Sequence, residues 1–155
     1  MPVQSLQQVL AAFVEERVEF IVFGAVALAA HGLVRATEDL DIFVDPGEDN
    51  IARLRTALKR VYPDDDAINE ITHADLAGDY PAVRYNAPDG FGVDILSRLG
   101  NVWSYGDIES EIVEFEGLQI RVATPGMLYK MKKDTIRWKD KFDAEALRQR
   151  FGLED

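Results

Sequence analysis

The hydrophobic pattern of the chain alternates between helical and strand-like repeats. Leu6, Val9, Leu10 and Phe13 follow the spacing of one helix face. An Ala-rich stretch stops at Gly32, a residue type that often ends a helix. The pattern predicts helices at residues 5–16, 25–31 and 51–61, from 124 onward, and at 140–151.

Short β-branched and aromatic runs alternate with these helices and predict strands. They lie at residues 19–23, 39–45, 82–86, 91–96, 112–115 and 118–122, and the last four pair as two hairpins. Residues 62–79 are acidic and weakly patterned, which indicates a loop with a helical turn or two. The expected fold is α/β or α+β, with a single mixed sheet flanked by helices, although the sequence does not give the strand order.

Composition indicates one globular domain spanning residues 1–155, with a sheet-bearing core at 1–123 and C-terminal helices at 124–155. Hydrophobic residues make up 47% of the chain and charged residues 29%, which excludes a disordered protein. The absence of cysteine excludes disulfides and thiolate zinc sites. We expect a cytoplasmic protein, because no signal peptide is visible and the apolar runs are too short to cross a bilayer.

The net charge of −11 argues against a broad nucleic-acid surface, yet one segment is basic. Residues 127–141 contain six basic and two acidic side chains, a local charge of +4 on an anionic body. Such a strip suits a local ligand that carries phosphate. Within it, Lys130 is the candidate for a triphosphate contact, and the other lysines are interpreted as a solvated face.

Two carboxylates on the second predicted strand are the first candidates for chemistry. Asp39 and Asp41 are two residues apart, so their side chains project from the same strand face. Two neighbouring anions repel each other unless a cation lies between them, which favours half of a divalent-metal site. The alternative is an ordinary solvated strand face.

Gly24-Ala25 stands at a strand-to-helix junction, where free backbone N–H groups favour an anion such as phosphate. A plain tight turn is the alternative. Asp94 interrupts one apolar face of a later strand and so requires a partner, either a metal ion or a hydrogen-bond donor. His31 is interpreted as structural, at a helix C-terminus. Arg35 either neutralises the carboxylates, contacts phosphate or forms an ordinary salt bridge.

These residues together resemble a known active-site signature, that of the nucleotidyltransferase (polymerase β-like) superfamily. The form H-G-x-x-R-x-T-x-D-x-D, from His31 to Asp41, is similar to the small bacterial branch that includes the AbiEii-type toxin nucleotidyltransferases. Asp94 matches the third carboxylate of the family, and residues 130–143 are similar to the C-terminal helices of that branch.

The resemblance implies transfer of a nucleoside monophosphate from an NTP to an acceptor hydroxyl, with release of pyrophosphate. It implies a two-ion Mg²⁺ or Mn²⁺ site at Asp39, Asp41 and Asp94. The nucleotide phosphates would contact Gly24, Ala25, Arg35, Thr37 and Lys130. The acceptor is left open between tRNA, a protein hydroxyl and a small molecule. The protein partner is left open between a second copy of the chain and a cognate protein. No membrane association is expected.

Two alternatives belong to other classes of protein. Ala25 stands where many relatives have Gly or Ser and offers no hydroxyl to phosphate, which favours a catalytically inactive nucleotide-binding or interaction module of a toxin–antitoxin-like system. The second alternative is a metal-dependent phosphodiesterase that uses the same carboxylates. A catalytic lysine close after an acidic strand residue would favour it, and none follows Asp39, Asp41 or Asp94.

Overall fold

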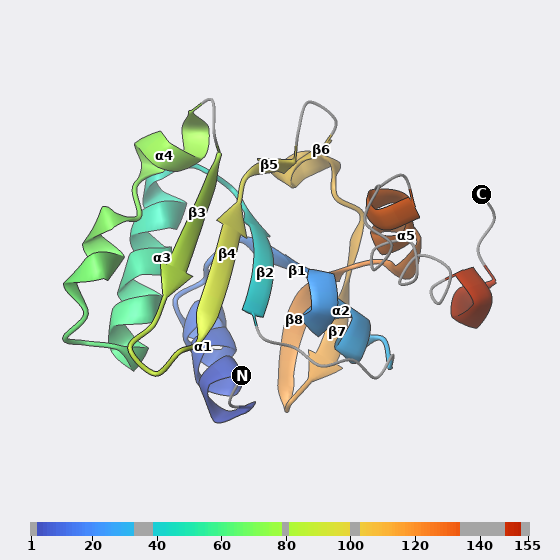
Figure 1. The fold of residues 1–155 in the computed structure, drawn as a ribbon, viewed down its shortest axis with the longest axis horizontal. Helices are drawn as coiled ribbons and strands as arrows, with labels where there is room; N and C mark the ends of the chain where they lie inside the picture. The colour runs from blue at the N-terminus through green and yellow to red at the C-terminus, as the bar shows by residue number, and fades with distance from the viewer. Residues whose placement is uncertain (1–2, 33–38, 79–80, 100–102, 134–147, 153–155) are drawn as a thin grey trace.

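The computed structural model describes residues 3–32, 39–78, 81–99, 103–133 and 148–152 (Figure 1). A six-stranded sheet runs through it in the order β3-β4-β2-β1-β8-β7. Its strands are β1 (Phe20–Phe23), β2 (Asp39–Val44), β3 (Ala82–Asn86), β4 (Gly92–Leu96), β7 (Ser110–Phe115) and β8 (Leu118–Ala123). The short strands β5 (Arg98–Leu99) and β6 (Trp103–Ser104) form a separate pair.

The sheet is mixed, as the sequence predicts. Parallel pairing joins β2 to β4 and β1 to β8, whereas β1 and β2 are antiparallel. The two predicted hairpins are confirmed as β3–β4 and β7–β8. The parallel pairings link segments far apart in the chain, and the one between β2 and β4 sets the geometry of the site.

Helices cover both faces of the sheet. They are α1 (Val3–Glu15), α2 (Gly24–Ala30), α3 (Glu48–Val61), α4 (His73–Ala77) and α5 (Pro125–Lys133), with 3₁₀ turns η1 (Asp66–Glu70) and η2 (Tyr105–Asp107). In Figure 1, α1 and α3 lie together behind the sheet and α2 lies in front of it. None of the helices in the described ranges is long and apolar enough to cross a membrane.

The alternation along β2 separates the core from the site. Leu40, Ile42 and Val44 are fully buried, and they share one strand face. Asp39 and Asp41 lie on the opposite face and are half-buried, while Phe43 on that face is fully buried and its ring contacts that of Phe23, with 4.6 Å between the ring centroids. Burial of one face therefore fixes the direction in which both carboxylates point.

Most predicted elements are confirmed, with small shifts at their ends. The acidic segment after α3 contains η1 and α4, in agreement with the expected helical turns. The pair β5–β6 was not predicted, since two-residue strands carry no periodic signal. The last predicted helix, 140–151, lies mostly outside the described residues. Its described part, residues 148–151, is helical.

Candidate active site

The register between β2 and β4 brings two of the predicted carboxylates side by side. Asp41 pairs with Asp94 across these parallel strands, so both side chains project from the same face of the sheet. Asp39 lies two residues before Asp41 and shares that face. Two segments distant in sequence therefore place three acidic side chains on one face of the sheet.

The turn from β1 into α2 lies directly beside this cluster. Phe23 pairs with Asp41 across β1 and β2, and Gly24 follows it with a φ of +68°. A Cβ atom added to Gly24 would lie 2.1 Å from Oδ2 of Asp41. Only glycine therefore fits here, both because of its left-handed backbone and because the carboxylate approaches the main chain so closely.

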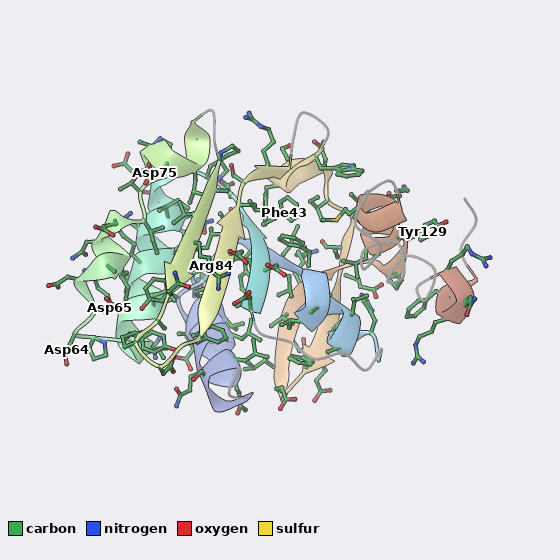
Figure 2. The ribbon with its side chains drawn as sticks, viewed as in Figure 1. Phe43, Asp64, Asp65, Asp75, Arg84 and Tyr129 are labelled. Atoms are coloured by element: carbon green, nitrogen blue, oxygen red, sulfur yellow. The ribbon has the colours of Figure 1, made fainter. Side chains whose placement is uncertain are left out.

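Arg84 is a site residue that the sequence analysis missed. It lies on β3 opposite Asp94, and it is labelled in Figure 2. Its Nη2 donates to Oδ1 of Asp39 at 2.8 Å, and its Nη1 donates to Oδ2 of Asp94 at 2.9 Å. These hydrogen bonds, first that to Asp39 and then that to Asp94, raise the pKa of Arg84 above its usual value. An arginine side chain is charged at neutral pH, so Arg84 is a fixed cation between the two carboxylates.

Gly92 is the second residue that the sequence analysis missed. It pairs with Asp39 on β2, and a Cβ atom added to it would lie 2.3 Å from Oδ1 of Asp39 and 2.5 Å from Nη2 of Arg84. The missing side chain at Gly92 thus leaves the space in which the ion pair between Asp39 and Arg84 forms. A glycine inside a strand often marks a close approach of this kind.

The donor set suits a divalent cation in the type of its ligand atoms. Carboxylate oxygens are the ligands that Mg²⁺ and Mn²⁺ take, and the side chains of Asp39 and Asp94 are 30% and 35% exposed, so a hydrated ion can reach them. Within the described ranges, however, no three Asp, Glu or His side chains converge as a ready metal cage. Asp39 and Asp94 each direct an oxygen at Arg84 instead.

The other predicted contacts are more dispersed. Ala25 lies in the first turn of α2, next to Gly24. Lys130 lies on α5, and its Nζ is 3.8 Å from Oε1 of Glu109. The structure does not place Lys130 in contact with the three carboxylates, so its phosphate contact stays a prediction. Arg35 and Thr37 lie outside the described residues.

His31 has a structural environment, in line with its interpretation from sequence. Its Nε2 donates to the carbonyl oxygen of Ala123 at 2.8 Å, at the end of β8. Its ring meets that of Phe151 edge-on, with 5.9 Å between the centroids. His31 therefore joins the end of α2 to the sheet and to the C-terminal helical segment.

Comparisons with solved structures support the fold. ANT(2″)-Ia in complex with adenylyl-2″-tobramycin matches with a TM-score of 0.59 at 13% identity, over 97% of this chain and 89% of that one. A putative nucleotidyltransferase from Thermotoga maritima matches with a TM-score of 0.51 at 17% identity, over 97% of this chain and 92% of that one. At such low identity these matches show a shared fold only.

Comparison with protein families is more specific, although no curated protein matches the sequence. The family model described as nucleotidyl transferase AbiEii toxin, type IV toxin–antitoxin system, matches residues 8–153. This range includes every strand of the sheet, the turn at Gly24 and the three gathered carboxylates. The chain therefore belongs to the AbiEii family of nucleotidyltransferase toxins.

Proposed function

We propose that this chain transfers a nucleoside monophosphate from an NTP to an acceptor hydroxyl and releases pyrophosphate. The observation that carries the proposal is the pairing of Asp41 with Asp94, on the face that Asp39 shares and beside the turn at Gly24. Membership of a nucleotidyltransferase family supports the same class of reaction.

In this proposal Asp39, Asp41 and Asp94 hold divalent ions, Mg²⁺ or Mn²⁺, in a two-ion site. Such ions, when bound, neutralise triphosphate charge and lower the pKa of an attacking hydroxyl. The acceptor oxygen bonds to the α-phosphorus, the bond from that atom to the bridging oxygen of the β-phosphate breaks, and the hydroxyl proton passes to water. The chain itself positions the reactants and supplies fixed charge.

Phosphate contacts are assigned to the turn and to one hydroxyl and two cationic side chains. Gly24 has no side chain and Ala25 only a methyl group, so a phosphate can approach the main chain at the start of α2. Arg35, Thr37 and Lys130 are proposed as further phosphate contacts. Of these, Lys130 offsets charge on the leaving pyrophosphate, and its loss lowers turnover by about 10²-fold, the effect typical of one electrostatic donor.

The acceptor is proposed at the level of its reacting group, a hydroxyl. The ANT(2″)-Ia structure contains adenylyl-2″-tobramycin, an adenylylated small molecule. For this chain a small molecule, tRNA and a protein hydroxyl are all candidate acceptors. Because the family is one of toxins of type IV toxin–antitoxin systems, we further propose action as a toxin with a cognate partner protein.

The test compares the wild type with Asp41→Asn, which removes one negative charge and keeps the shape of the side chain. Each protein is incubated with one labelled NTP at a time, Mg²⁺ or Mn²⁺, and pooled cellular RNA and protein. The wild type should transfer label and release pyrophosphate, whereas Asp41→Asn should do neither.

Asp45→Asn is the matched control. Asp45 follows β2 and accepts a hydrogen bond from the backbone N–H of Gly47 at 2.8 Å, which an asparagine oxygen can also accept. This variant should keep the activity of the wild type. Stoichiometric NTP binding by the wild type without pyrophosphate release would refute the enzymatic proposal and favour a nucleotide-binding module.

A further inference from the structure

Arg84 occupies the space between two of the carboxylates that are proposed to hold metal. Its two Nη atoms bond to different carboxylates, one on Asp39 of β2 and one on Asp94 of β4. The positive centre of the guanidinium is thus held between them. A divalent ion bound between these carboxylates would compete with the guanidinium for the same space and the same negative charge.

The charges of the cluster also argue against simultaneous binding of Arg84 and a metal ion. Three carboxylates on one sheet face repel one another, and Arg84 is the cation that is seen to bond to two of them. A divalent ion would replace that compensation with a larger charge. If Arg84 stayed in place, two cations would lie within a few ångströms of each other, which is strongly unfavourable.

Arg84 is able to leave without unfolding the site. It lies on β3, the edge strand of the sheet, and its side chain is 44% exposed. Its Nε also bonds to Oδ1 of Asn86 at 3.0 Å, two residues along the same strand, so a second polar contact exists away from the carboxylates. Rotation of one exposed side chain frees oxygens of Asp39 and Asp94.

We propose that Arg84 is a built-in counter-cation that competes with the divalent metal, so that its ion pairs with Asp39 and Asp94 and metal binding by these residues exclude each other. The inference rests on the proposed function, because it concerns the same three carboxylates. It gives the metal-free protein a charge-compensated site from which a metal ion displaces Arg84.

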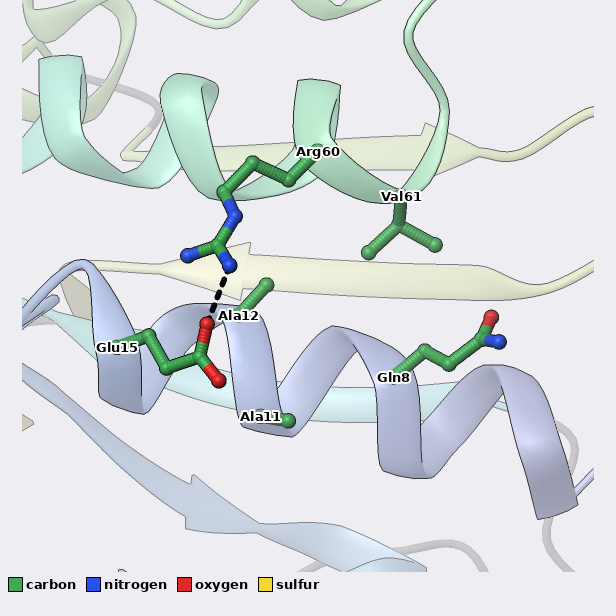
Figure 3. A pocket seen from close by; sticks show the side chains of 6 residues that line it. All are labelled: Gln8, Ala11, Ala12, Glu15, Arg60 and Val61. Carbon is green, nitrogen blue, oxygen red and sulfur yellow. Dashed lines mark hydrogen bonds and ion pairs between the residues drawn. The ribbon is translucent and has the colours of Figure 1, made fainter.

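A second arginine provides a matched control. Arg60 also bridges two carboxylates, Glu15 and Glu16, and its side chain is 45% exposed. Figure 3 shows its ion pair with Glu15. This cluster links α3 to the end of α1 and shares no residue with the site. Arg60→Gln therefore removes an equivalent guanidinium without touching the proposed metal ligands.

The experiment measures Mn²⁺ binding without nucleotide, by electron paramagnetic resonance of free Mn²⁺. Wild type, Arg84→Gln, Arg60→Gln and Asp41→Asn are compared. We expect Arg84→Gln to bind Mn²⁺ about fivefold more tightly than the wild type, from the loss of two partly exposed ion pairs. Arg60→Gln should match the wild type, and Asp41→Asn should bind more weakly.

Thermal melting gives a second readout. Saturating Mn²⁺ should raise the melting temperature of Arg84→Gln more than that of the wild type, because tighter binding to the native state stabilises it more. If Arg84→Gln does not fold, Arg84→Lys replaces it. Lysine keeps the charge but has one compact ammonium in place of the fork, so Mn²⁺ affinity should still exceed that of the wild type.

The outcomes separate this inference from the proposed function. Mn²⁺ binding that depends on Asp41, with the same or lower affinity in the folded Arg84 variant than in the wild type, would overturn the competition and leave the metal site standing. The absence of Asp41-dependent Mn²⁺ binding from the wild type and from the folded Arg84 variant would overturn both.

Discussion

Two regions of the molecule contain nearly the same ion-pair arrangement. Arg84 bridges Asp39 and Asp94 on the sheet, and Arg60 bridges Glu15 and Glu16 between two helices. The side chains of the two arginines are almost equally exposed, at 44% and 45%. In both, the hydrogen bonds that the guanidinium donates to the carboxylates raise the pKa of the arginine. Charge and exposure alone therefore do not distinguish the site from an ordinary surface link.

The backbone that carries the carboxylates does distinguish the two regions. Glu15 and Glu16 are consecutive residues with long side chains at the end of one helix, so several torsions set their positions. Asp39 and Asp94 have short side chains on two strands whose register is fixed by the ladder and by a buried face. The sheet thus holds its carboxylates in place before any cation arrives, and such preorganisation suits a binding site.

Glycines sharpen the contrast further. Gly24 and Gly92 each leave space that a carboxylate of the site fills, at distances that would place an added Cβ within 2.1 Å and 2.3 Å of an oxygen. The groove around Arg60 is lined instead by Gln8, Ala11, Ala12, Glu15 and Val61, residues with ordinary side chains (Figure 3). The main chain at two glycines therefore makes room for the carboxylates of the site, whereas only side chains form the link between the helices.

The largest effect is expected from Gly24→Ala. The alanine would have to adopt a left-handed backbone conformation, and its methyl group would lie against the Asp41 carboxylate. We therefore expect a loss of about 2 to 4 kcal/mol in the free energy of unfolding. Chemical denaturation of the folded variant measures the loss. Transfer of labelled nucleotide should fall as well, because Asp41 is displaced.

Gly117→Ala separates the two causes. Gly117 has a φ of +78° in the turn between β7 and β8, and nothing lies within 4 Å of an added Cβ. This variant should lose only the backbone contribution, about 1 kcal/mol, and should keep activity. Equal losses for Gly24→Ala and Gly117→Ala would contradict the close packing of Asp41 on the turn.

A smaller effect is expected from Gly92→Ala. Its backbone is ordinary, so only the contact with Asp39 and Arg84 is disturbed, and both neighbours are side-chain ends that can move. We expect a loss of about 1 to 2 kcal/mol in the free energy of unfolding, measured as for Gly24→Ala. Gly106→Ala, with nothing within 4 Å of an added Cβ, is the control and should be neutral. Neutral behaviour of both variants would show that the ion pair does not need the space at Gly92.

The parts of the site that could be predicted from sequence are those with a local signal. Asp39, Asp41 and Asp94 stand out because a carboxylate is rare on an apolar strand, and alternation within one strand shows which residues share a face. That Asp94 lies beside Asp41 depends on a parallel pairing between distant segments, which no local pattern encodes. The general architecture follows from periodicity, whereas strand order does not.

Arg84 could not be linked to Asp94 from sequence, because one residue of hairpin register decides which face of the sheet it shares. The sequence predicts hairpin strands that end at Asn86 and resume at Phe91; pairing these two ends would place Arg84 opposite Val93, on the wrong face. The structure pairs Asn86 with Gly92 and Arg84 with Asp94. Gly92 within a strand was the available signal, since it indicates a close approach by a neighbour.

The smallest effects are expected when each arginine is replaced in the metal-free protein. Arg84→Gln leaves three carboxylates on fixed strands, so its melting temperature should fall, by an amount equivalent to at most about 1 kcal/mol for partly exposed pairs. Arg60→Gln should change the melting temperature little, because Glu15 and Glu16 can rotate apart into water. High salt should reduce the loss in Arg84→Gln by screening the carboxylates from one another. An equal, salt-sensitive loss in both variants would mean that the strands hold their charges no more firmly than the helices do.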